Sequence, residues 1–141
     1  MKDKTKTGYT ITKKVMDDVF HLNEVNFEEV NSLEYLQEAV GGYIEVIRLE
    51  NDVCIWINEE GKINGMKPNT ALLDKNGKIF DVIHGDFVLT AVNEEGDTVP
   101  MTMEQVNYFE TLGNRPIIAT MGEKTVVLST LMFKNFESGK K

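Results

Sequence analysis

The sequence predicts an α+β domain, a mainly antiparallel β-sheet with two short helices packed on it. Short apolar segments separated by turn signals run along most of the chain, and only two segments have helical spacing. Runs of strands interrupted by isolated helices are typical of an antiparallel sheet that carries its helices on a face. A length of 141 residues fits a single domain.

Further strands are expected over residues 9–31 and 113–136, on either side of a central part over residues 32–112. Residues 1–8 and 137–141 are short and polar, so we expect both ends to be frayed.

The N-terminal part is expected to form paired strands. The segments YTITKKV (9–15) and EVNFEEV (24–30) both carry apolar residues at every second or third position. A helix over residues 32–40 follows, because its apolar residues recur at helical spacing and Asn31 or Ser32 can cap it. Two glycines then end this helix, since glycine takes the left-handed C-terminal conformation at little cost.

Two strands are predicted next, over residues 43–49 and 53–57, joined by a tight turn at Asn51 and Asp52. The second of these strands, VCIWI, is apolar on both faces. A strand of this kind is typical of a central position with cover on both sides of the sheet.

The C-terminal half is predicted to contain more strands and a second helix. Asn76-Gly77 marks a turn before the strand DFVLTAV, and an acidic turn follows that strand. Thr102 and Gln105 form a capping box that opens a helix to about Leu112. The segment RPIIATMGEKTVVLSTLMF then predicts two apolar strands joined by a turn.

Charge and composition exclude several classes of protein. Fifteen basic and twenty-three acidic residues give a net charge of −8, which argues against a non-specific nucleic-acid binder. The single cysteine, Cys54, cannot form an internal disulfide, and the sequence has no signal-peptide core and no apolar stretch of membrane-spanning length. We therefore expect a cytoplasmic protein that does not bind membranes.

The sequence does not indicate an enzyme. No HExxH, CxxC, GxSxG, GxGxxG or phosphate-loop motif occurs, so neither a metal nor a cofactor is expected. His84 with Asp81 and Asp86 could support acid–base chemistry or contact a phosphate. A histidine beside a turn glycine, with acids that cap and solubilise, is the simpler interpretation.

Two groups of residues could bind a ligand. Trp56 and Tyr43 are aromatic side chains able to stack on a base, although Trp56 in so apolar a strand also fits the core. The other group is the polar stretch NEEGKINGMKPNTA over residues 58–71. Its glycines allow close backbone approach to a ligand, and its side chains offer amides, a hydroxyl and an ammonium; the alternative is a connector made of two turns. The residues predicted to contact a ligand are Asn58, Gly65, Lys67, Asn69, Thr70, Trp56, Tyr43, His84 and Asp86.

Four motifs in order resemble one family. They are GGYIE at Gly41 to Glu45, NEEGK at Asn58 to Lys62, GMKPNTA at Gly65 to Ala71, and DVIHGDF at Asp81 to Phe87. Together they resemble DUF3846, a family known as a domain of unknown function, over residues 32–112. Thr70 stands where this family usually carries arginine, and Lys67 could partly replace that cation.

The resemblance implies a small cytoplasmic protein of bacterial phages, plasmids or other mobile elements, with no known enzymatic activity. Such proteins often act against host defences. We therefore expect a counter-defence protein that sequesters a small polar, nucleotide-type immune signal without cleaving it. A homo-oligomer would suit this role, because a site between subunits can bury most of a ligand. The alternative is an acidic protein–protein inhibitor or DNA mimic that covers a host defence protein.

Overall fold

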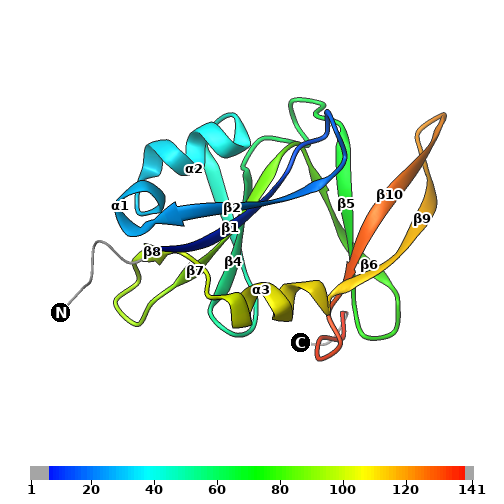
Figure 1. The fold of residues 1–141 in the computed structure, drawn as a ribbon. Coiled ribbons are helices and arrows are strands. Elements are labelled where there is room, and N and C mark those ends of the chain that lie inside the picture. Colours follow the sequence, from blue (N-terminus) through cyan, green and yellow to red (C-terminus); the bar gives the residue numbers. More distant parts are fainter. Residues whose placement is uncertain (1–6, 139–141) are drawn as a thin grey trace.

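The computed structural model describes residues 7–138, and it folds them into two β-sheets and three short helices (Figure 1). The strands are β1 (Thr7–Lys13), β2 (Phe20–Asn26), β3 (Ile44–Arg48), β4 (Val53–Asn58), β5 (Pro68–Leu73), β6 (Ile79–His84), β7 (Phe87–Val92), β8 (Thr98–Val99), β9 (Gly113–Met121) and β10 (Lys124–Met132). The helices are α1 (Phe27–Val30), α2 (Leu33–Val40) and α3 (Met103–Glu110).

The strands divide between two sheets. The first has the order β2-β1-β7-β4-β3 with β8 beside β7, and all its pairs are antiparallel. The second has the order β6-β5-β10-β9, and β5 and β10 run parallel. The predicted class, mainly antiparallel with few short helices, is confirmed. The parallel pair is possible because a long connection, which includes β7, β8 and α3, lies between β5 and β10 in the chain.

The main core lies between the two sheets. Its buried side chains come from both inner faces and from α3, which covers one end of the sandwich (Figure 1). They are Ile11, Val53, Ile55, Leu72, Ile83, Phe87, Leu89, Ala91, Met101, Val106, Phe109, Leu112 and Leu131.

The first sheet is also covered on its outer face. There α2 packs Leu36 and Val40 against Val88 and Trp56. β4 therefore contacts the main core with one face and α2 with the other, which confirms the central position predicted from its apolar sequence.

Local capping explains where the two longer helices begin and end. The Ser32 hydroxyl accepts a hydrogen bond from the Tyr35 amide at 3.3 Å, and Gly41 ends α2 in the left-handed conformation with φ of 78°. The predicted capping box of Thr102 and Gln105 is present at the start of α3. Both predicted helices are confirmed.

One predicted strand is wrong in its second half. Residues 24–30 were expected to form a strand, but β2 ends at Asn26 and α1 begins at Phe27. The Asn26 side chain accepts a hydrogen bond from the Glu29 amide at 2.8 Å and so caps a helical turn. Phe27 and Val30 are three positions apart and both buried, which suits one helical face as well as an irregular strand alternation.

The described residues at the two chain ends are ordered, although frayed ends were expected there. Thr7 and Gly8 belong to β1, and Ser138 is hydrogen-bonded to Asp74. The rest of the predicted frayed ends, residues 1–6 and 139–141, lies outside the described residues. None of the helices in residues 7–138 has both the length and the apolar character needed to span a membrane.

Candidate functional site

The predicted binding loop, residues 58–71, connects β4 to β5 and folds back onto the β6–β7 turn. The Met66 carbonyl lies 2.9 Å from Nδ1 of His84, and the Gly85 amide donates to the Lys67 carbonyl at 2.9 Å. Gly65 has a φ of 67°, which requires the conformational freedom of glycine in this tight turn. The loop is thus an ordered connector tied to residues 84–85.

The buried part of this loop holds a lysine of the first sheet. Lys13 is only 1 % exposed, and its Nζ donates to Oδ1 of Asn69 at 2.6 Å and to the Asn69 carbonyl at 3.2 Å. Asp18 pairs with the same ammonium, and the Phe20 ring lies 5.6 Å from it. A buried charge needs such partners, because its desolvation is otherwise very costly.

The Asn69 amide is fully engaged within the protein. Its Nδ2 donates to the carbonyls of Lys13 and Gly85, at 3.1 and 2.9 Å, and its Oδ1 also accepts from the Thr70 hydroxyl. The Thr70 hydroxyl lies 2.8 Å from that of Ser129 on β10. Asn69 and Thr70 therefore join β1, β5 and β10, and this is a structural role.

The remaining predicted contacts are spread over the molecule. Asn58 bonds the Val40 carbonyl at the end of α2, and the Trp56 indole donates to Thr90 at 2.9 Å. Tyr43 is 67 % exposed. Asp86 accepts a hydrogen bond from the amide of Val15.

The predicted histidine–carboxylate group is not joined by hydrogen bonds in the described residues. Asp81 accepts from Lys62 Nζ at 2.6 Å, whereas His84 contacts Met66 and Asp86 contacts the β1–β2 connection. The structure thus brings Lys67 and Asn69 against the 84–86 turn, and Gly65 lies two residues before Lys67 in the same loop. Whether a ligand binds there stays a prediction.

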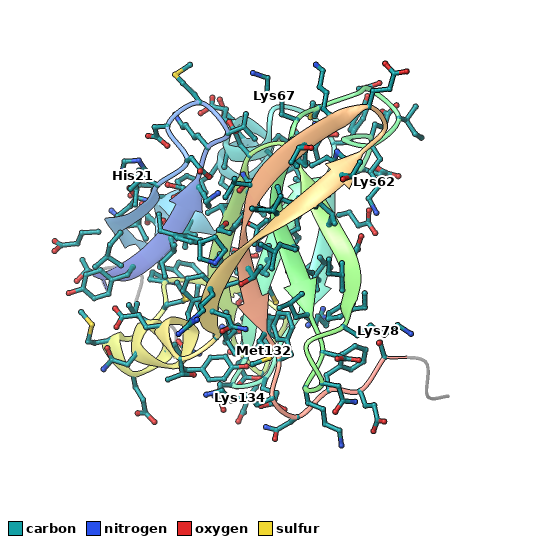
Figure 2. The ribbon with its side chains drawn as sticks, turned by 90° about the vertical axis from the view of Figure 1, so that its right-hand side faces the viewer. His21, Lys62, Lys67, Lys78, Met132 and Lys134 are labelled. Atoms are coloured by element: carbon teal, nitrogen blue, oxygen red, sulfur yellow. The ribbon has the colours of Figure 1, made fainter. Side chains whose placement is uncertain are left out.

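A cavity of about 580 Å³ lies elsewhere, between one end of the first sheet, the edge strand β6, the end of α3 and the C-terminal segment. This volume is in the range of small-molecule sites. Figure 2 labels Lys134 of this region at the lower end of the molecule, and Lys62 and Lys67 of the predicted loop at the upper end. The lining residues are Ile47, Arg48, Leu49, Glu50, Phe80, Tyr108, Thr111, Leu112, Phe133, Lys134, Asn135 and Phe136.

Aromatic side chains form much of the cavity wall. The Phe80 ring lies 5.8 Å from that of Phe133 and 4.7 Å from that of Phe136, measured between ring centroids. Phe80 is 36 % exposed and Phe136 is 44 % exposed, so both have surface that a ligand could contact. Burial raises the pKa of Tyr108, and the nearby charge of Glu50 raises it further, so its hydroxyl stays protonated.

Charged and amide groups lie at the rim of the cavity. Asn135 Nδ2 donates to Oε2 of Glu50 at 3.1 Å, and Lys134 is exposed beside Asn135. Along β3, Ile47 packs toward the main core, and the next side chain, Arg48, points to the opposite face.

The C-terminal wall of the cavity is anchored by Asp74. Its Oδ2 accepts from the hydroxyl of Ser138 at 2.6 Å and from the Ser138 amide at 3.1 Å. Its Oδ1 accepts from the amides of Asn76 and Lys78, both at 2.9 Å. The Lys75 amide donates to the Phe136 carbonyl at 2.7 Å, which fixes the backbone that carries this ring.

This anchor predicts a dependence of stability on acid pH. The Ser138 hydrogen bond, assisted by backbone amides against burial, lowers the pKa of Asp74 from 3.8 to about 2. A lowered pKa stabilises the fold above pH 3.8, and this contribution is lost as the pH falls to about 2. The difference in unfolding free energy between the wild type and Asp74→Asn should therefore shrink between pH 4 and pH 2. Urea denaturation at several pH values measures it, and a constant difference would contradict the role of the carboxylate.

Two other kinds of chemistry find little support in the described residues. No group of three or more histidine, cysteine, aspartate or glutamate side chains in residues 7–138 is arranged to hold a metal ion. Cys54 is buried and free, and burial raises the pKa of its thiol, which makes it a poor nucleophile.

The fold and the cavity define a small two-sheet β-sandwich with a ligand-sized aromatic pocket at one end. The chain belongs to DUF3846, a domain of unknown function, which matches residues 16–114. The resemblance in the sequence is thereby confirmed, and the match begins earlier than residue 32. It includes the loop of residues 58–71 but not the cavity wall at 133–136. Neither a curated protein nor a solved structure matches the chain.

Proposed function

We propose that this protein binds a small nucleotide-type ligand in the aromatic cavity and holds it without cleaving it. The observation that carries the proposal is the wall of Phe80, Tyr108, Phe133 and Phe136 around a volume of about 580 Å³. Bases stack on aromatic side chains with about 1–3 kcal/mol per base, and the exposed ring surface here suits such stacking. The ammonium of Lys134 at the rim suits a phosphate.

The residues that line the cavity favour binding of a ligand rather than catalysis of its cleavage. Among its residues there is no histidine or cysteine in the described part of the chain. Its one carboxylate, Glu50, is bonded to Asn135, and its phenol, Tyr108, stays protonated. Nucleophilic catalysis usually needs a nucleophile and a base within hydrogen-bond reach of each other.

A biological role follows from this binding if the protein acts in a phage or another mobile element, as the family resemblance implies. A protein that holds an immune-signal nucleotide lowers the free concentration of that signal. We therefore propose counter-defence by sequestration.

A thermal-shift panel of mono-, di- and cyclic nucleotides tests the proposal. A ligand at 100 times its dissociation constant adds about 2.7 kcal/mol, which is roughly 5–10 °C in Tm for a chain of this size. The shift should disappear in Phe136→Ala and persist in Ile118→Ala, because Ile118 is an exposed apolar residue on the β9–β10 hairpin. The ligand should be recovered intact by mass spectrometry. A cleaved product, or no shift with any nucleotide, would refute the proposal.

A second candidate function is supported by the charge of the α1–α2 surface. Four exposed glutamates lie on α1 and α2, namely Glu28, Glu29, Glu34 and Glu38, and the sequence between them has no lysine or arginine. Such a surface could cover a basic site of a host protein, and salt would then weaken the complex. Replacing Glu34 and Glu38 with glutamine should slow the association; an unchanged rate at low salt would count against this candidate.

A further inference from the structure

We infer that the ligand of the aromatic cavity carries a purine-type ring with an exocyclic amino group, which is recognised by Glu50. This inference rests on the proposed function and names the chemical class of its ligand. It is carried by the one carboxylate among the lining residues of the cavity, by its hydrogen bond to Asn135 and by the neighbouring donors.

The position of Glu50 is fixed from two sides. It opens the β3–β4 turn, in which Asn51 and Asp52 both have positive φ angles, 61° and 59°. The Gln105 side chain donates to the Asn51 carbonyl at 2.8 Å and ties this turn to α3. On the other side, Asn135 reaches across 85 positions of sequence to Oε2 of Glu50. The turn that carries Glu50 is thus tied to α3, and its carboxylate accepts a hydrogen bond from Asn135 at the rim.

The Glu50 carboxylate at the rim favours a ligand that carries a hydrogen-bond donor. An ionised carboxylate only accepts hydrogen bonds, and its two oxygens offer about four lone-pair sites. Asn135 uses one of them, so acceptor sites remain for N–H groups of a ligand. The amino group of an adenine-type ring can donate to these sites, whereas a carbonyl at the same ring position would place its lone pairs against a negative charge.

The rest of the ligand follows from the neighbouring groups. A planar ring can lie on the exposed surfaces of Phe80 and Phe136 while its amino edge faces Glu50. Lys134 precedes Asn135 directly in the chain and supplies an exposed ammonium at the same rim. An anionic group of the ligand could then pair with the Lys134 ammonium, as the phosphate of a purine nucleoside phosphate would.

Titration calorimetry with AMP and IMP tests the inference, because these nucleotides differ at the amino group. We expect the wild type to bind AMP at least about tenfold more tightly than IMP, since charge-assisted hydrogen bonds are the stronger kind. In Glu50→Gln the ratio should fall below about threefold, because an amide can donate to the carbonyl of IMP as well as accept. Glu38→Gln removes the same charge from α2 and should keep the wild-type ratio.

The possible failures are distinguishable. Equal affinities for AMP and IMP in the wild type, both lost in Phe136→Ala, would overturn the inference and leave the proposed function standing. A Glu50→Gln variant that keeps the full preference for AMP would also overturn the assignment to Glu50. No binding of any nucleotide would overturn both the inference and the proposed function.

Discussion

Replacing Asn69 with alanine is expected to lower the free energy of unfolding by about 3 kcal/mol. The substitution removes the Oδ1 acceptor of the buried Lys13 ammonium, and it leaves the carbonyls of Lys13 and Gly85 without the Nδ2 donor. Truncating one partner of a buried charge is more costly than removing an exposed contact, because the remaining charge cannot return to water.

Equilibrium urea denaturation measures this loss, and Asn64→Ala in the same loop is the matched control. Asn64 is exposed, so its replacement should change the unfolding free energy by less than about 0.5 kcal/mol. The comparison also separates two interpretations of the loop. If Asn69→Ala kept wild-type stability but lost nucleotide binding, the ligand site predicted from the sequence would be supported in place of the structural role.

Replacing Phe87 with alanine is expected to cost about 3–5 kcal/mol of unfolding free energy. Phe87 begins β7 in the middle of the first sheet, is 0 % exposed, and packs edge-on against Phe20 with ring centroids 6.2 Å apart. The truncation leaves a cavity between two sheets that are held by their own hydrogen bonds. Little collapse is therefore possible, and the lost contacts are not replaced.

Phe80→Ala is the control for this prediction, because it removes the same atoms from a residue that is 36 % exposed at the cavity wall. We expect the unfolding free energy of this variant to fall by about 1–2 kcal/mol. The loss is smaller because Phe80 buries less apolar surface in the folded protein than Phe87 does. Chemical denaturation of both variants gives the comparison. Equal losses would show that the inter-sheet core is not the main source of stability around Phe87.

The elements predicted well from the sequence are those whose signals are local. The caps of α2 and α3 are set by residues within four positions, so Ser32, Gly41 and the Thr102–Gln105 pair could be recognised directly. The central position of β4 was also predictable, because an apolar strand without alternation needs cover on both faces.

The sheet division and the residues around Asn69 depend on contacts distant in sequence. Thr70 pairs with Ser129 across the parallel β5–β10 ladder, and Asn69 meets Lys13 across 56 positions. A polar stretch that binds a ligand and one that binds a buried lysine have the same composition. The sequence therefore singled out Asn69 as a polar contact residue but did not identify Lys13 as its partner.

The cavity was missed because none of its walls forms a motif. Phe80 lies on an edge strand, Tyr108 is half-buried near the end of α3, and Phe133 and Phe136 lie in a segment expected to be the end of a strand. The spacing of Phe133 and Phe136 after the last strand was the one available signal. Contacts distant in sequence bring that segment against β6, among them the hydrogen bonds of Asp74 to Ser138 and of the Lys75 amide to the Phe136 carbonyl.

A crystal structure of the protein grown with saturating AMP tests the binding proposal most directly. We predict electron density for the intact nucleotide in the cavity, with its ring against Phe80 and Phe136, its amino group within hydrogen-bond distance of Glu50, and its phosphate near Lys134. An empty cavity at saturation, or a nucleotide bound at residues 58–71, would contradict this account.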